Sequence, residues 1–177
     1  MNEKVAEIKQ QAGRKIETMT IVADFFKMST MEQYQSTIGE KMHGLDIGIL
    51  VPNAGWSIMG PVASLRNEEV ENTVAINALH PLYLTKVLLP KMEDRRKKGA
   101  ILFISSLFGR MPSSGISTYS ASKAFVSYFG QALAIELENK IDVTVYEAGE
   151  ISTKLLRKRE SMTVISTKRA SYEALRQ

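Results

Sequence analysis

Apolar residues in this chain fall into short runs separated by longer amphipathic stretches. Four runs rich in β-branched residues predict buried strands, at residues 18–23, 47–51, 100–105 and 143–146. The remaining stretches predict helices, at residues 2–14, 29–42, 67–94, 117–139 and from 152 onward. Because the strand runs are apolar throughout, the sheet should be mostly parallel and covered on both faces. The prediction is an α/β fold with three layers.

Two details refine the predicted helices. Ser29 or Thr30 can cap the helix that runs to about Met42. Pro81 lies inside the long helix at 67–94 and should bend or interrupt it, because proline has no backbone N–H to donate.

Polar and glycine residues directly follow the predicted strands. Asp24, the segment 53–55, Ser106 and Gly149 each come after a strand. Ligands of parallel α/β sheets bind beyond the carboxyl ends of the strands. These residues are therefore expected to meet at one edge of the sheet and to form a binding site there.

The strongest candidate chemistry lies in the helix at 117–139. Tyr119 and Lys123 are four residues apart and share a helix face. A lysine ammonium beside a phenol favours the phenolate, so Lys123 should lower the pKa of Tyr119 and let it exchange protons near neutral pH. Ser106 could hold a substrate oxygen against the tyrosine. The alternative for the Tyr–Lys pair alone is an ordinary solvated helix face.

Together these residues carry a family resemblance. Tyr119-x-x-x-Lys123, the upstream Ser106, the segment Asn53-Ala54-Gly55 and Asn77 resemble the motifs of the short-chain dehydrogenase/reductase family. Within that family, residues 44–55, 89–109 and 153–159 resemble the group of very-long-chain 3-oxoacyl-CoA reductases and 17-beta-hydroxysteroid dehydrogenase type 12.

The resemblance implies an oxidoreductase that moves a hydride between NADP or NAD and a ketone or secondary alcohol. The substrate would be lipid-like, either a 3-oxoacyl-CoA or a steroid. Tyr119 would exchange the proton, and Lys123 would lower its pKa and hold the nicotinamide ribose. Ser106 would orient the carbonyl, and Asn77 would hold a water in the proton relay; its alternative is an amide satisfied by a helix backbone.

The resemblance also implies a cofactor site. Asn53, Ala54 and Gly55 would let the backbone approach adenosine, and Asp24 could bind the adenine amine. An ordinary turn and a strand-end residue are the respective alternatives. Ile151 and Thr153 would hold the nicotinamide carboxamide. The chain departs from the family pattern in three places, which are Pro52, Ala148 and Glu150.

The glycine-rich turn that opens a dinucleotide-binding fold is not found among the eleven glycines. The expected fold is therefore a Rossmann-like domain over residues 1–177 that lacks the first β-α-β unit. We interpret the chain as the central part of a reductase. The alternative function is that of a catalytically dead fragment or paralogue that acts as a binding or regulatory partner of an intact reductase.

Composition narrows the classes of function. The chain has no cysteine and two histidines, which excludes disulfides and cysteine-rich or histidine-rich metal sites. The net charge is 23 − 19 = +4, and residues 150–177 carry the excess, with seven basic and three acidic side chains. This basic tail could meet coenzyme A phosphates or an anionic membrane surface, although a solvated helix face is the common explanation. It has no features of nucleic-acid recognition.

Two expectations concern the setting of the chain. No run approaches the ~18 apolar residues of a membrane span, so an intracellular protein is expected, at the endoplasmic reticulum if it follows the resembling group and otherwise cytoplasmic. The helices at 74–89 and 117–139 are apolar around most of their circumference. A helix with two apolar faces needs a second partner, and a homodimer is therefore predicted.

Overall fold

The computed structural model describes residues 2–152, 161 and 163–176. The larger helices are α1 (Asn2–Gln11), α2 (Met31–Tyr34), α3 (Asn67–Val74), α4 (His80–Glu93), α5 (Ser117–Glu136) and α6 (Thr167–Ala174). Single turns of 3-10 or π helix are η1 (Gln35–Gly39), η2 (Glu40–Met42), η3 (Val62–Ser64), η4 (Ala75–Leu79) and η5 (Leu107–Gly109). The strands are β1 (Ile49–Leu50), β2 (Gly99–Ser106), β3 (Ile141–Ala148), β4 (Glu150–Ile151) and β5 (Val164–Ile165).

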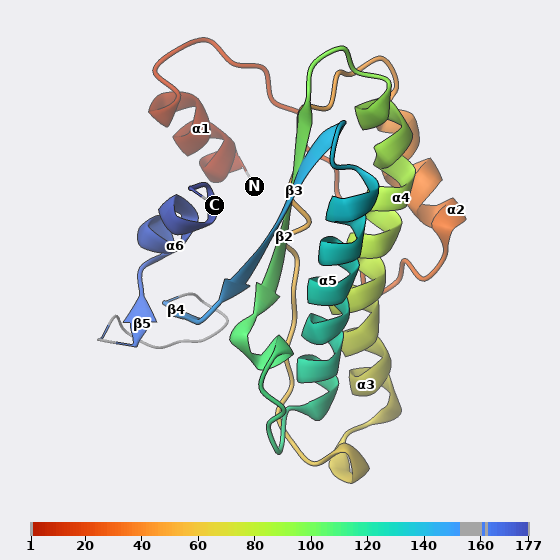
Figure 1. The fold of residues 1–177 in the computed structure, drawn as a ribbon, viewed down its shortest axis with the longest axis vertical. Helices are drawn as coiled ribbons and strands as arrows, with labels where there is room; N and C mark the ends of the chain where they lie inside the picture. Colours follow the sequence, from red (N-terminus) through yellow and green to blue (C-terminus); the bar gives the residue numbers. More distant parts are fainter. Residues whose placement is uncertain (1, 153–160, 162, 177) are drawn as a thin grey trace.

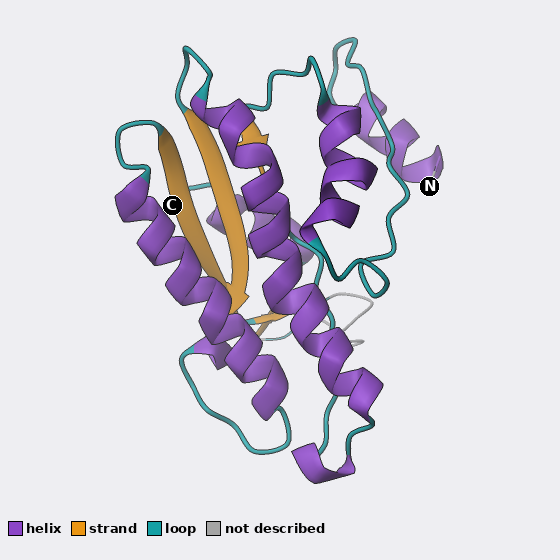
Figure 2. Cartoon of the chain, turned by 90° about the vertical axis from the view of Figure 1, so that its right-hand side faces the viewer, coloured by secondary structure: helices purple, strands orange, loops and turns teal. Residues whose placement is uncertain are grey.

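A parallel sheet with the order β1-β2-β3 lies at the centre of the fold. Figure 1 shows α4 and α5 on one side of β2 and β3, and α1 and α6 on the other. Figure 2 looks onto the helical layer formed by α3, α4 and α5. The predicted α/β architecture with a parallel sheet is confirmed. A second pair of parallel strands, β4 and β5, follows the sheet in the chain.

The two faces of the sheet are covered unequally. On the side of α4 and α5, Ile101 and Phe103 are at most 1% exposed and form the main core with Val126 and Leu133 of α5. On the opposite side, Leu102 and Ile104 are only half-buried, against a smaller cluster that includes Ala174 of α6. For β2, the expected burial is therefore complete at Ile101 and Phe103 on one face and partial at Leu102 and Ile104 on the other.

The predicted strand at 18–23 is wrong. Residues 18–23 have no regular secondary structure, and Met19 and Val22 are 58% and 75% exposed. A strand needs a hydrogen-bonded neighbour, and within the described residues β1 pairs with β2 alone. The predicted strand at 47–51 shortens to the two residues of β1, which lies at the edge of the sheet.

The predicted capping of the helix at 29–42 is confirmed. Thr30 is the capping residue, since its hydroxyl oxygen accepts a hydrogen bond from the backbone N–H of Gln33 at 3.3 Å. In return, the Gln33 side chain accepts from the backbone N–H of Thr30 at 3.1 Å, which completes a capping box. The helical turns then continue through η1 and η2 to Met42, as predicted.

The long helix predicted at 67–94 is interrupted at the place that proline suggested. The π-helical turn η4 separates α3 from α4, and Pro81 occupies the first turn of α4. Because Pro81 cannot donate an intrahelical hydrogen bond, a change in helical hydrogen bonding just before it is expected.

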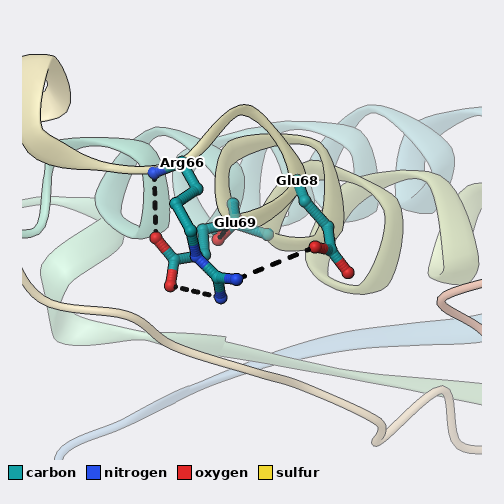
Figure 3. A network of polar contacts seen from close by, with 4 residues as sticks. Arg66, Glu68 and Glu69 are labelled. Carbon is teal, nitrogen blue, oxygen red and sulfur yellow. Dashed lines mark hydrogen bonds and ion pairs between the residues drawn. The ribbon is translucent and has the colours of Figure 1, made fainter.

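The beginning of α3 carries a small network of charges (Figure 3). The backbone N–H of Arg66 donates to the Glu69 carboxylate at 2.9 Å, and the Arg66 guanidinium donates to the same carboxylate at 2.9 Å. The Arg66 hydrogen bond lowers the pKa of Glu69. Glu68 lies within 4.0 Å of the guanidinium. Acidic side chains at a helix N-terminus also stabilise the helix, because they interact favourably with its dipole.

The tail predicted to be helical from Ser152 is only partly so. Residues 153–160 and 162 lie outside the described residues. Strand β5 precedes α6, so a continuous helix from Ser152 is a wrong prediction. None of the helices within the described ranges is long and apolar enough to cross a membrane.

Buried His80 makes the fold sensitive to acid. The residue is 2% exposed, its ring is tilted by 37° against the Phe25 ring with centroids 3.8 Å apart, and its Nδ1 lies 3.3 Å from the Tyr34 hydroxyl. Burial lowers the pKa of His80 to about 4 from an ordinary value of 6.5. Since the folded pKa lies below the unfolded one, the stabilisation is present above pH 6.5 and is lost as pH falls through 4.

We therefore expect wild type to lose about 3 kcal/mol of unfolding free energy between pH 6.5 and pH 4 relative to His80→Gln. Urea titrations at several pH values measure this difference. His43→Gln is the matched control, because His43 is exposed and its replacement should leave the acid sensitivity in place. Parallel pH profiles for wild type and His80→Gln would contradict the prediction.

Candidate active site

Lys123 lies at the centre of the candidate site, between α5 and β2. Its ammonium donates to the backbone carbonyl of Ile104 at 2.9 Å, and its own backbone carbonyl accepts from the Ser105 hydroxyl at 2.8 Å. Lys123 is therefore fastened to β2 through both its side chain and its backbone. The residue is 6% exposed, and this burial lowers the pKa of Lys123 to about 8.

Tyr119 lies one helical turn before Lys123, with its ring centroid 5.9 Å from the lysine nitrogen. Burial is the largest influence on its phenol and raises the pKa of Tyr119, whereas a hydrogen bond with Ser106 lowers it. The expectation that Lys123 shifts the tyrosine pKa downward is not met in this structure. The physical reason is that the free-energy cost of removing a phenolate from water exceeds the stabilisation that the neighbouring groups provide.

Ser106 ends β2 and begins the turn η5. Its hydroxyl oxygen accepts from the backbone N–H of Phe108 at 3.3 Å, which caps η5. The Ser106 side chain also lies near the Tyr119 phenol and lowers its pKa. The structure therefore brings together Ser106, Tyr119 and Lys123, although they come from two different elements. A hydroxyl pair beside a buried ammonium can donate a proton to a carbonyl oxygen and hold that oxygen in place.

Asn77, in η4, fastens the loop after β1 to the same site. Its amide oxygen accepts from the backbone N–H of Trp56 at 3.0 Å, and its amide nitrogen donates to the Trp56 carbonyl at 2.7 Å. Its partner is thus a loop backbone rather than a helix backbone. A side chain added at Gly55 would lie 3.4 Å from the Asn77 oxygen and 3.6 Å from the Lys123 nitrogen. The loop 53–56 therefore reaches the lysine, as expected.

The other predicted cofactor residues lie in three different settings. Asn53 is exposed and Ala54 is half-buried, in the loop that Asn77 holds. Asp24 accepts from the Phe26 backbone at 3.2 Å, and the Phe26 ring meets Trp56 edge-on with centroids 5.7 Å apart. Asp24 is thus near the same loop, within a turn of its own. Ile151 packs against the cluster on the far face of the sheet. Thr153 lies outside the described residues.

Sequence reasoning missed three residues that support the site. Ser105, Ser127 and Trp56 provide hydrogen bonds to Lys123 or Asn77, or to each other. Ser105 stands directly before the predicted serine and Ser127 lies four residues after the lysine, so helix periodicity was the one available signal. A cavity of about 410 Å³ lies beside η5 and is lined by Phe108 and Ser120 among others, but its lining does not include Tyr119 or Lys123.

The structure thus places a buried lysine, a tyrosine and a serine beside the carboxyl end of the central strand of a parallel sheet. The model of the short chain dehydrogenase family matches residues 1–163. The chain therefore belongs to the short-chain dehydrogenase family.

Individual proteins agree with this assignment. The chain is 41% identical over 130 residues to the very-long-chain 3-oxoacyl-CoA reductase of Bos taurus, covering 71% of this chain and 40% of that protein. It is 37% identical over 149 residues to the reductase of the same name from Neurospora crassa, covering 82% and 44%. It thus spans less than half the length of these curated relatives. A short-chain dehydrogenase from Sphingobium yanoikuyae, solved in complex with NADPH, shares the fold with a TM-score of 0.82 at 24% identity, covering 98% of this chain and 68% of that one.

The buried lysine gives stability a distinctive dependence on alkaline pH. The folded pKa of Lys123, about 8, lies below its ordinary value of 10.5. The cost of burying the ammonium is therefore present below pH 8, and stability is gained as pH rises from 8 toward 10.5.

Relative to Lys123→Met, we expect wild type to gain about 3 kcal/mol of unfolding free energy over this range, measured by urea titration. Lys86→Met, a change at an exposed position of α4, is the matched control and should follow wild type. A wild-type profile that stays parallel to that of Lys123→Met would show that the ammonium is not buried.

Proposed function

We propose that this chain carries the catalytic centre of an NAD(P)-dependent reductase that interconverts a ketone and a secondary alcohol. The single observation that carries the proposal is the position of the Tyr119 ring, whose centroid lies 5.9 Å from the nitrogen of the buried Lys123, next to the end of β2 that bears Ser106. Membership of the short-chain dehydrogenase family supports the same reaction class.

In the proposed mechanism, the Tyr119 phenol gives its proton to the carbonyl oxygen of the substrate. Ser106 donates a second hydrogen bond to that oxygen, and the ammonium of Lys123 stabilises the phenolate that forms. Asn77 keeps the loop 53–56 against the lysine and would connect the relay to water. A bound nicotinamide cofactor would supply the hydride that the carbonyl carbon receives.

The residues present fit such a cofactor. The Lys123 ammonium has three N–H donors. Within the described part of the chain, one of them donates to the Ile104 carbonyl. The remaining donors could bind ribose hydroxyls. Asn53, Ala54 and Gly55 would approach the adenosine half and Asp24 its amine, while Ile151 and Thr153 are proposed for the carboxamide. NADP or NAD would serve, and the solved relative with NADPH favours the former.

The proposed substrate is a lipid-like ketone of the 3-oxoacyl-CoA or steroid class. The support is the identity of 37% to 41% to proteins named very-long-chain 3-oxoacyl-CoA reductase. The location proposed for the whole protein, the endoplasmic reticulum, rests on the same likeness.

One observation favours a second candidate function. Within the described residues, no strand is followed by a glycine-rich turn and a helix, so the usual cradle for a pyrophosphate is not seen. A chain that keeps the Tyr119 site without that cradle could act as a binding or regulatory partner of an intact reductase.

Replacing the tyrosine tests the reaction. With NADPH and a 3-oxoacyl-CoA or a steroid ketone, Tyr119→Phe should lower the rate of reduction by about 10²- to 10⁴-fold, because the proton donor is lost. Tyr128→Phe is the matched control, since Tyr128 is 79% exposed on the outer side of the same helix, and it should keep the wild-type rate. A Tyr119→Phe rate within tenfold of wild type would refute the assignment.

A titration of NADPH and NADH, followed by nicotinamide fluorescence, separates the two candidate functions. Binding that weakens in Lys123→Met supports the reductase. A chain that binds neither cofactor, yet co-purifies with an intact reductase of the family, supports the regulatory partner.

We also propose a homodimer formed through α5 and the helical segment at 74–89. Phe125, Tyr128 and Ile135 are 40%, 79% and 79% exposed and follow one another along one face of α5. An exposed apolar stripe on a 20-residue helix is a typical interaction surface. Phe129 is unsuited as a probe of this surface, because its ring packs edge-on against Phe103 of the core.

Ile135→Glu should therefore shift the chain from dimer to monomer in sedimentation velocity at micromolar concentration. Met59→Glu is the control, since Met59 is 78% exposed in a loop and should leave the dimer intact. A wild-type chain that sediments as a clean monomer would exclude this interface.

A further inference from the structure

The turn that begins at Ser106 is attached to its neighbours at both ends. Ser106 directly precedes the turn η5 and caps it, and Arg110 directly follows its last residue, Gly109. Between them, Gly109 lies directly on the backbone of α5. A Cβ at Gly109 would lie 3.0 Å from the Lys123 carbonyl carbon, which is closer than ordinary side-chain contacts. The turn therefore touches the helix at the residue that bears the ammonium.

Arg110 is ion-paired to Glu147 on β3. The guanidinium Nε lies 2.5 Å from a Glu147 carboxylate oxygen. The Glu147 side chain is 12% exposed, whereas that of Arg110 is 69% exposed. Exposed ion pairs contribute little to structure, but a mostly buried carboxylate depends on its partner, because water solvates it poorly. This pair therefore ties the segment after Ser106 to the neighbouring strand.

The same carboxylate lies beside a chain of hydroxyls that ends at Lys123. Glu147 is paired in the sheet with Ser105, and its second oxygen lies 3.5 Å from the Ser127 hydroxyl. The hydroxyls of Ser127 and Ser105 are 2.7 Å apart, and Ser105 is 2.8 Å from the Lys123 carbonyl. Ser105 and Ser127 each have one hydroxyl proton, so only two of these three contacts can be hydrogen bonds. The two short contacts are therefore the hydrogen bonds: Ser127 donates to Ser105, and Ser105 donates to the Lys123 carbonyl.

We propose that Glu147 is a positioning residue for this site. Its carboxylate holds the turn of Ser106 through Arg110 and packs against the hydroxyls that fasten Lys123. Glu147 thereby holds the Ser106 hydroxyl in its position beside the Tyr119 phenol. This inference rests on the proposed function for its catalytic meaning, but the geometry that it predicts can be measured without catalysis.

The test uses the ionisation of Tyr119 as a reporter of its contact with Ser106. The full chain is labelled with 3-fluorotyrosine, and each phenol is titrated by 19F NMR. The Tyr119 signal is assigned by its disappearance in Tyr119→Phe. Ser106 and Lys123 lie beside this phenol, and hydrogen bonding by Ser106 lowers the pKa of Tyr119. Loss of that bond in Glu147→Gln should raise the pKa of Tyr119 by about one unit.

The direction of the shift separates positioning from simple electrostatics. Removing a negative charge would by itself favour the phenolate and lower the pKa, so an upward shift indicates a lost hydrogen bond. Ser106→Ala should give the same upward shift, and in the double variant Glu147→Gln should add no further upward shift. Arg110→Lys keeps the ion pair and should stay close to wild type. Asp142 lies on β3, as Glu147 does, and its exposed carboxylate pairs with Lys98. Asp142→Asn should therefore leave the pKa of Tyr119 unchanged.

An unchanged Tyr119 titration in Glu147→Gln, or an upward shift that persists in the Ser106→Ala background, would overturn the proposal. If Glu147→Gln does not fold, Arg110→Met serves in its place, because this side chain is mostly exposed and the Ser106→Ala background again isolates the positioning effect. In the reductase assay, Glu147→Gln should lower kcat about tenfold with KM changed less than twofold. A positive NMR result without any reductase activity would leave the positioning intact and refute the proposed function alone.

Discussion

The burial of Lys123 between α5 and β2 is the interaction on which the rest of the site depends. An ammonium with 6% exposure must be hydrogen-bonded, and the Ile104 carbonyl provides its acceptor inside the sheet. This bond and the Ser105 contact to the Lys123 backbone set the rotation and height of α5 over the strand. Tyr119, one turn before Lys123 on the same helix, is thereby placed beside the end of β2 that bears Ser106.

The arrangement of charge at the site follows from competition between burial and neighbours. Burial disfavours both the ammonium of Lys123 and the phenolate of Tyr119, and it therefore shifts their pKa values in opposite directions, with the pKa of Lys123 falling to about 8. The tyrosine pKa rises, and Ser106 is the group that opposes the rise. In this structure the serine is therefore the group that favours the phenolate, which makes its exact placement by η5 and Arg110 consequential.

The unequal cover of the sheet explains where the fold is firm and where it is open. The side of β2 and β3 that faces α4 and α5 holds the main core, with buried Ile101 and Phe103 on β2 and partly buried Val143 and Val145 on β3. Ser106, Tyr119 and Lys123 lie on β2 and α5, which form this core. The edge beyond β1 has no partner strand within the described residues, and residues 18–23 lie there without regular structure. The site is thus built on the best-packed half of the molecule.

Much of this could be predicted from the sequence, because the signals were local. The strands at 100–105 and 143–146 and the helix at 117–139 follow from apolar runs and periodicity, and the structure extends or trims each by a few residues. The capping box at Thr30 and the interruption before Pro81 follow from the hydrogen-bonding capacity of single residues. The pairing of Tyr119 with Lys123 follows from helical spacing.

Tertiary structure decided whatever depended on contacts between distant residues. An apolar run such as 18–23 becomes a strand only beside a partner, which local sequence cannot supply. The pKa of Tyr119 depends on how much water the fold removes, and so its direction could not be obtained from the spacing of a lysine. The pairing of Asn77 with Trp56, and of Arg110 with Glu147, joins residues 21 and 37 positions apart. The sequence alone determined which residues could do chemistry, and the packing of α5 on the sheet determined which of them meet.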